Sequence, residues 1–197
     1  MFTQNGRILF EVASAIQKEI RRGNEEQALY WALELLPRYE KYLWKRLIII
    51  ANEDIGIANC RAVEFVTNQC AAWFRLREMG AQTESILILA NAILAMCRSP
   101  KCRLADHLLC VCITHWQDEE RDIPDYALDK HTLRGKQLGR GMQFFLDNED
   151  DLLKDTSAVF DPYRDEAREL WLNNKPSKSA EWAKPKKTES AEQGELF

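Results

Sequence analysis

The chain has 197 residues, of which 46% are hydrophobic and 29% charged, and its formal net charge is −4. This length suits one domain around a single core, and the composition is ordinary for a globular protein. The mild negative charge argues against a protein that coats nucleic acid by bulk charge. Because no apolar run approaches the ~18 residues that cross a bilayer, we expect no membrane span.

Cysteine, glycine and proline counts narrow the class further. The N-terminus has no basic stretch followed by an apolar core, so we expect no signal peptide. Six cysteines without a secretory signal then predict reduced thiols in a cytoplasmic protein. Eight glycines and six prolines supply little turn chemistry, which disfavours a many-stranded β protein.

Helical periodicity runs through the first 117 residues. The core-facing stripe of the first helix consists of Ile8, Leu9, Val12, Ile16 and Ile20. Gly23 stands where a helix C-cap belongs, and Asn24 followed by Gln27 resembles a capping box for a second helix over residues 25–36. Pro37 is expected to close that helix, and a third covers residues 38–51.

Three more helices complete the expected bundle, residues 6–117. One covers residues 61–79 and ends at Gly80, and the next, residues 82–97, is apolar on two faces and is expected at the centre. Ser99-Pro100 opens the sixth, which runs to about Trp116, because proline suits the first turn of a helix. Short connections favour an up-and-down arrangement.

The pattern changes after the bundle. Residues 118–172 form an appendage with an acidic loop (118–125), a basic glycine-rich stretch, and short helices at 142–146 and 161–172. Together, residues 1–172 make one all-helical domain. Residues 173–197 have few apolar groups and are expected to be a disordered, flexible tail.

Enzymatic and metal chemistry find little support. Six cysteine and histidine residues crowd one stretch, but at helical spacing they scatter around the axis instead of converging on a zinc ion: Cys97, Cys102, His107, Cys110, Cys112 and His115. No phosphate loop, dinucleotide fingerprint or nucleophile elbow is present. The acidic residues at 118–122 fit a solvated loop better than a metal-dependent nuclease.

The acidic pair Glu53-Asp54 stands in an unfavourable place, because negative charges near a helix C-terminus oppose the helix macrodipole. A structural interpretation is favoured over a functional one. On this interpretation the helix ends by Asn52, the carboxylates accept backbone N–H groups of the next element, and Gly56 allows the turn.

Residues 130–141 are the candidate contact with a phosphate backbone. Glycines there let the main chain approach closely, and the cationic side chains are Lys130, His131, Arg134, Lys136 and Arg140. The competing hypothesis is a solvated loop whose Leu133 and Leu138 pack onto the bundle. The sequence does not choose between the two.

The last residues form a peptide-anchor pattern. Gln193 offers a fork of hydrogen bonds, and Leu196 and Phe197 would fill a pocket on a partner. Leu-Phe at the end of a polar tail makes no core, so a structural role explains it poorly.

Residues 10–116 resemble the C-terminal helical region of the replication-associated recombination protein A (MgsA) family of AAA ATPases. The residues that carry the resemblance are 15–21, 28–32, the run 46–58 with Glu53, Asp54 and Gly56, Arg61-Ala62-Val63 and Ser99-Pro100-Lys101. The resemblance implies an all-helical domain similar to clamp-loader collars. In that family this region assembles tetramers, and the proteins work at replication forks on DNA. The present chain differs from the family because it lacks the ATPase module.

The tail resembles the clamp-binding peptide of bacterial replication proteins, commonly Gln-Leu-Ser/Asp-Leu-Phe. Gln193, Glu195, Leu196 and Phe197 fit the pattern, while Gly194 replaces the usual leucine. We therefore expect a non-catalytic, cofactor-free and metal-free protein of replication and recombination that self-associates, binds the sliding clamp and contacts DNA. Two alternatives stay open: an interaction subunit of a separately encoded AAA ATPase, and a metal-dependent enzyme.

Overall fold

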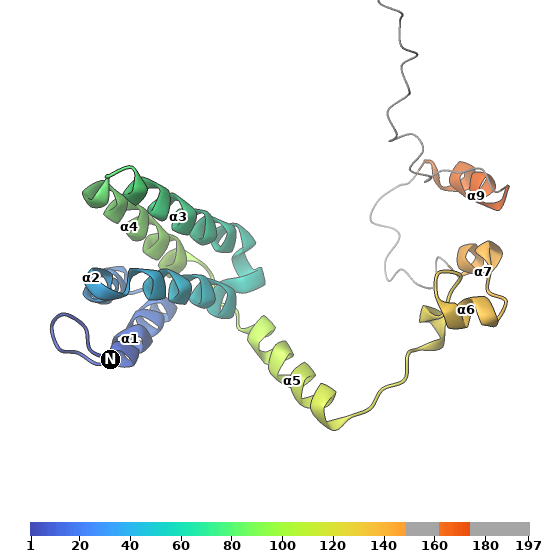
Figure 1. The fold of residues 1–197 in the computed structure, drawn as a ribbon, viewed down its shortest axis with the longest axis horizontal. Helices are drawn as coiled ribbons and strands as arrows, with labels where there is room; N and C mark the ends of the chain where they lie inside the picture. The colour runs from blue at the N-terminus through green and yellow to red at the C-terminus, as the bar shows by residue number, and fades with distance from the viewer. Residues whose placement is uncertain (149–161, 174–197) are drawn as a thin grey trace, which may run out of the picture. The chain divides into compact units, whose positions relative to one another are not determined.

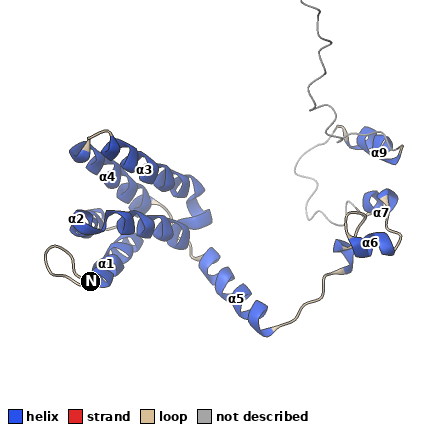
Figure 2. Cartoon of the chain, viewed as in Figure 1, coloured by secondary structure: helices blue, strands red, loops and turns tan. Residues whose placement is uncertain are grey.

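The computed structural model describes residues 1–148 and 162–173 (Figure 1). The chain divides into two compact units, Met1–Glu120 and Arg121–Phe197. The described residues are helical apart from turns, loops and one isolated antiparallel bridge between Phe2 and Ile8, as expected for an all-α protein (Figure 2). In this part of the chain no helix has the length and apolarity needed to cross a bilayer.

The first unit is built on two helical hairpins. α1 (Leu9–Arg22) packs against α2 (Glu25–Ile50), and α3 (Cys60–Glu78) packs against α4 (Gln82–Arg98). The turns η1 (Ala51–Ile55) and η2 (Gly56–Asn59) join the hairpins. The largest fully buried side chains are Trp44, Trp73, Leu9, Ile16, Ile20, Leu35, Leu43, Leu47, Ile50, Ile55, Leu89 and Ile93. The rings of Trp44 and Trp73 contact each other within this core in a tilted arrangement, with their centroids 5.5 Å apart and an angle of 54° between the rings.

The connection between α1 and α2 confirms one prediction and corrects another. Gly23 ends α1 in the left-handed conformation, at φ 76°, as its position in the sequence indicates. Asn24, however, makes no capping hydrogen bond to α2. Its side-chain amide instead donates to Glu19 Oε2 at 2.6 Å, so the predicted capping box is absent.

Pro37 does not close a helix, contrary to the prediction. α2 continues past it, with one non-helical residue, Tyr39, at φ −129° and ψ 35°. Proline removes a backbone donor and kinks a helix, but buried residues on both sides, Leu35 and Leu43, hold the two halves on the same core. Packing thus continues the helix where local propensity would end it.

α4 is less enclosed than its two apolar faces predict. It contacts α1, α2 and α3, and it buries Leu89, Ile93 and Met96. Leu87 on its other face is nevertheless 68% exposed. The first unit therefore carries apolar side chains that its own core does not use.

The expected sixth helix is α5, Leu104–Asp118, and it differs from the prediction in two respects. Pro100 lies before the helix, in a non-helical segment, not in its first turn. Lys101 in that segment donates to the carbonyl oxygens of Met96, Cys97 and Ser99 at 2.6–3.0 Å, which caps the end of α4. No residue of α5 is buried, so this helix adds nothing to the bundle core.

The described part of the second unit is built from short helices. These are η3 (Asp125–Ala127), α6 (Leu133–Gln137), α7 (Met142–Asp147) and α9 (Arg164–Leu172), the last close to the helix expected over 161–172. Its buried residues are Leu128, Gly135 and Leu146. Arg168 of α9 donates to the Leu146 carbonyl oxygen at 2.6 Å.

Candidate functional site

Glu53 and Asp54 lie inside a helical segment, although the sequence predicts that the helix ends before them. The backbone continues from α2 through the π-helical turn η1 as far as Ile55, and Gly56 then turns at φ 48° and ψ −126°. The prediction that Gly56 allows the turn is confirmed. The prediction that the helix ends by Asn52, and that the two carboxylates accept backbone N–H groups, is wrong, because their partners are side chains.

Asp54 is the buried centre of a polar cluster, with 1% of its surface exposed. Its carboxylate accepts hydrogen bonds from Gln17 Nε2 at 2.9 Å and from Arg21 Nε at 2.8 Å, both on α1. Arg103 Nε lies 3.7 Å from the same carboxylate, and the Cys102 N–H donates to the Asp54 carbonyl oxygen at 2.8 Å. Asp54 therefore connects α1, η1 and the segment that leads into α5.

Glu53 and a third arginine extend the cluster. Glu53 Oε1 accepts from Arg21 Nη2 at 3.0 Å and from Arg103 Nη2 at 3.3 Å. Arg46 Nη2 of α2 donates to Gln17 Oε1 at 2.6 Å. Both carboxylates are engaged by arginines, so the arrangement suits positioning of the chain more than acid–base chemistry. The sequence indicated the acidic pair but not its partners on α1, which are spaced i, i+4.

The basic glycine-rich stretch is held together by its own cations. Arg140 donates from Nη2 to both Asp125 carboxylate oxygens at 2.8 and 2.7 Å, and from Nη1 to the Asp125 and Leu128 carbonyl oxygens. Its guanidinium also lies 4.6 Å from the Phe144 ring centroid. Arg140 is thus a structural residue of the second unit, and its predicted role toward phosphate is not supported by these contacts.

Lys130 and His131 also have partners within the unit. Lys130 Nζ lies 5.3 Å from the Phe145 ring centroid and 3.1 Å from Met142 Sδ. His131 Nδ1 lies 2.9 Å from the Asp129 carboxylate, and the His131 side chain and N–H hold the pKa of that carboxyl below its usual value.

Arg134 and Lys136 are the remaining two predicted cations, and both side chains are exposed on α6. Leu133 and Leu138, which the competing hypothesis packs onto the bundle, are 73% and 59% exposed. The surface left for an anionic partner is therefore the exposed face of α6 around Arg134 and Lys136.

The cysteine and histidine residues do not form a cluster. Among the residues that the structure describes, no group of three or more His, Cys, Asp or Glu side chains is placed to hold a metal ion. Cys97 is buried in the core, while Cys110 and Cys112 are exposed on α5.

Burial raises the pKa of the Cys97 thiol to about 11. We expect Cys97 to react with a thiol reagent at pH 8 at least roughly 100-fold more slowly than the exposed Cys60, because the thiolate is the nucleophile. Mass-spectrometric labelling of both residues measures this ratio, and labelling in urea, where both thiols are free, is the control. Equal native rates would contradict the burial of Cys97.

The remaining predicted residues take no part in the side-chain contacts described above. Gln193, Glu195, Leu196 and Phe197 fall outside the described residues. Pro100 is exposed beside the capping Lys101.

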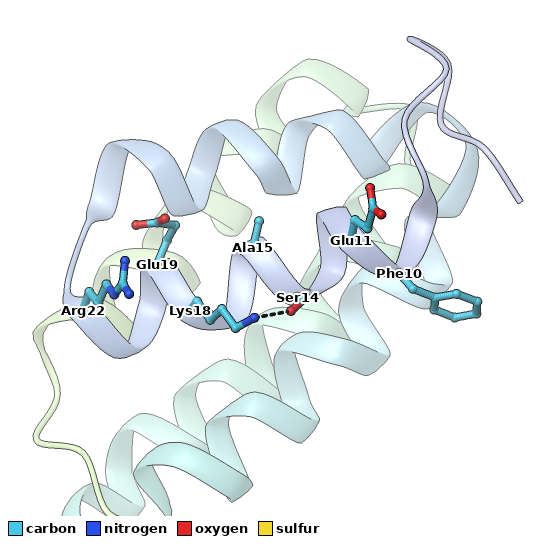
Figure 3. A pocket seen from close by; sticks show the side chains of 7 residues that line it. All are labelled: Phe10, Glu11, Ser14, Ala15, Lys18, Glu19 and Arg22. Carbon is cyan, nitrogen blue, oxygen red and sulfur yellow. Dashed lines mark hydrogen bonds between the residues drawn. The ribbon is translucent and has the colours of Figure 1, made fainter.

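A shallow hollow of about 500 Å³ lies along α1, lined by Phe10, Glu11, Ser14, Ala15, Lys18, Glu19 and Arg22 (Figure 3). Lys18 Nζ donates there to Ser14 Oγ at 3.0 Å. Two acidic and two basic side chains balance each other along the hollow, so it has no charge preference that points to a ligand. The predicted site residues lie elsewhere.

Residues 23–169 match the family described as MgsA AAA+ ATPase C terminal. The chain belongs to this family. Several bacterial proteins named replication-associated recombination protein A are similar to it. The protein of Bacillus subtilis is 29% identical over 143 residues, and that of Haemophilus influenzae is 28% identical over 150 residues.

The family relationship covers most of this chain but a minor part of its relatives. The alignments cover 72% and 73% of the chain, and 33% and 32% of the Bacillus and Haemophilus proteins. The Escherichia coli K12 protein is 26% identical over 150 residues, again with 32% of its length covered. The chain thus spans about a third of the length of these relatives, and the match to the MgsA C-terminal family begins after α1, at residue 23, and extends into α9.

Proposed function

We propose that this protein is a non-catalytic accessory factor of DNA replication and recombination, which self-associates through its helical unit and docks on the sliding clamp through its C-terminus. The observation that carries the proposal is the match to the MgsA C-terminal family over residues 23–169. The relatives are named for replication-associated recombination, and the 197 residues contain no phosphate loop that would drive an ATPase.

The Asp54 cluster supports this interpretation. Its carboxylate is 1% exposed and holds two side chains of α1, so substrate has no access to it. Together with Arg103, which precedes α5, the cluster fixes where α5 leaves the bundle. On this proposal the unit presents surfaces to partners and performs no chemistry of its own.

Clamp docking is tested with the last five residues. Deletion of residues 193–197, or Phe197→Ala alone, should abolish binding to the sliding clamp in titration calorimetry, because both remove an apolar anchor. Gly194→Leu should tighten binding, because it restores the leucine common at that place of the motif. Helical circular dichroism of all variants should stay that of the parent. Equal affinity of the parent and the deletion variant would refute clamp docking.

Contact with DNA is expected at the exposed cations of α6. Arg134→Ala with Lys136→Ala should weaken binding to a DNA duplex and lower the slope of log affinity against log salt by about 2, one for each lost phosphate contact. Fluorescence anisotropy over a salt series measures both values. Lys41→Ala with Lys45→Ala, which removes two exposed cations of α2, is the matched control and should leave the slope unchanged. An unchanged slope in the α6 variant would exclude this surface.

A further inference from the structure

A second hollow of the first unit, of about 480 Å³, is lined by α2 and α3. Its walls are apolar apart from two lysines, and the lining residues are Lys41, Trp44, Lys45, Ile48, Ile49, Cys70 and Phe74. Ile48, Cys70 and Phe74 also pack against the core, so the packing of the unit fixes the shape of these walls. Hollows of this size with mostly apolar walls and few polar groups are typical of binding sites.

The two lysines give the hollow a charge preference. Lys41 and Lys45 are exposed and lie one turn apart on α2, and neither has an ion-pair partner among the described residues. Glu40, the acidic residue beside Lys41 in the sequence, is held instead by Arg77 at 2.7 Å. The hollow thus combines apolar walls with two cations that are free to pair with carboxylates of a ligand.

The walls and the cations together restrict the kind of ligand. An extended peptide presents backbone N–H and C=O groups, and the lining helices have bonded their own backbone groups internally and offer no sheet edge to pair with it. A nucleic acid would pair with the lysines and leave the apolar walls uncovered. A helix satisfies its own backbone, so an amphipathic helix with acidic residues one turn apart beside large apolar side chains fits both features.

The acidic helix of this chain already packs elsewhere. α9 carries Asp165, Glu166 and Glu169, and it contacts α7 within the second unit. Arg168 of α9 holds the two helices together through its hydrogen bond to the Leu146 carbonyl oxygen at 2.6 Å. The hollow therefore calls for a helix from a different protein.

We infer that the hollow between α2 and α3 binds an acidic amphipathic helix of another protein, a contact that goes beyond clamp docking and DNA binding. Two carboxylates of the partner pair with Lys41 and Lys45, and its apolar side chains cover Ile49 and Phe74. From Lys41 to Ile49 the axis of α2 rises about 12 Å, which corresponds to about two turns of a partner helix laid along it.

A model peptide tests the site in the full chain. The probe is an alanine-rich helical peptide with glutamates at i and i+4 and phenylalanines at i+3 and i+7. Its fluorescence anisotropy should show saturable binding to the parent. Lys41→Ala with Lys45→Ala should weaken binding about 2- to 30-fold, because two exposed ion pairs are lost. No binding to the parent, or equal affinity of this variant, would overturn the inference. Arg134→Ala with Lys136→Ala, the matched loss of two exposed cations, should leave the affinity unchanged.

The apolar wall is tested at Ile49, which lines the hollow and is not among the residues packed against the core. Ile49→Glu should weaken peptide binding further than the lysine variant, because it places a carboxylate against an acidic partner and removes an apolar contact. Leu87→Glu is the matched control, since Leu87 is 68% exposed on α4 and does not line the hollow. Circular dichroism of both variants should match that of the parent. Equal peptide affinity of the two variants would contradict the inference.

The native Cys70 reports where the peptide binds. The bound peptide should slow the reaction of Cys70 with a thiol reagent, while the exposed Cys60 should keep its rate. This measurement needs no substitution, so it does not depend on the folding of a variant. A peptide that binds and leaves Cys70 unprotected would lie elsewhere, and the inference would be wrong.

Two further measurements separate the site from other surfaces of the chain. Glu166→Gln with Glu169→Gln in α9 should leave the peptide affinity unchanged, and tighter binding would show that this helix competes for the hollow, which would overturn the inference. Clamp binding and the salt slope of DNA binding should be those of the parent in the Lys41, Lys45 and Ile49 variants, because the proposed clamp and DNA contacts lie at residues 193–197 and on α6. The proposed function and the hollow are therefore tested independently.

Discussion

Asp54→Ala is expected to destabilise the first unit by about 3 kcal/mol, the lower end of the cost of breaking a buried ion pair. The substitution leaves Gln17 without its acceptor and Arg21 without its principal counter-charge. The Arg21 side chain is 34% exposed and reaches water in part, so the cost stays below that of a fully buried cation. Urea unfolding at pH 7 measures the change.

Two further substitutions separate the effect of losing the Asp54 charge from the effect of changing any residue in this turn. Asp54→Asn keeps an acceptor oxygen and loses the charge, so we expect its free energy of unfolding to lie between those of the parent and the alanine variant. Asn52→Ala alters an exposed residue two positions earlier and should stay within about 0.5 kcal/mol of the parent. A loss below about 1 kcal/mol for Asp54→Ala would show that the cluster contributes no more than a surface ion pair.

The same cluster shows what sequence reasoning reaches and where it stops. Periodicity predicts the helices of the first unit, and the unfavourable place of two acidic residues near a helix C-terminus singles out Glu53 and Asp54, with Gly56 as the residue that allows a turn. It could not supply Gln17 and Arg21, because these partners lie more than 30 residues away and are brought close by the packing of α1 on α2. Long-range side-chain pairing is a property of the tertiary arrangement.

The kink at Pro37 and the partners of Arg140 have a related physical cause. Proline is a strong local signal, yet the core on both sides of Pro37 outweighs it and leaves a kink. A basic residue among glycines fits phosphate binding as a local pattern, yet Arg140 is satisfied by Asp125, 15 residues earlier. In both places the conformation depends on a contact with residues that are distant in the sequence. Of the five cations predicted to contact phosphate, the two that lie exposed on α6 are Arg134 and Lys136.

Gly135→Ala adds a single methyl group and is expected to unfold the second unit locally. An added Cβ would lie 1.8 Å from the carbonyl oxygen of Asp129 and 2.5 Å from the carbonyl carbon. Because these are backbone atoms, they cannot move away by a change of side-chain rotamer. The same turn contains the cap of α6, in which Thr132 Oγ1 accepts from the Gly135 N–H at 2.9 Å.

Overpacking of this kind costs about 1–3 kcal/mol, which corresponds to a loss of amide protection of roughly 5- to 150-fold in α6 and α7. Hydrogen exchange of residues 133–147 measures it, while the protection of α1–α4 should be unchanged because that core lies in the first unit. Gly141→Ala is the matched control, since nothing lies within 4 Å of its added Cβ and its φ of −92° suits any residue. If both alanine variants keep the parent protection, the close approach of α6 to the Asp129 turn does not exist in solution. The placement of Arg134 and Lys136 on α6 would then be wrong as well.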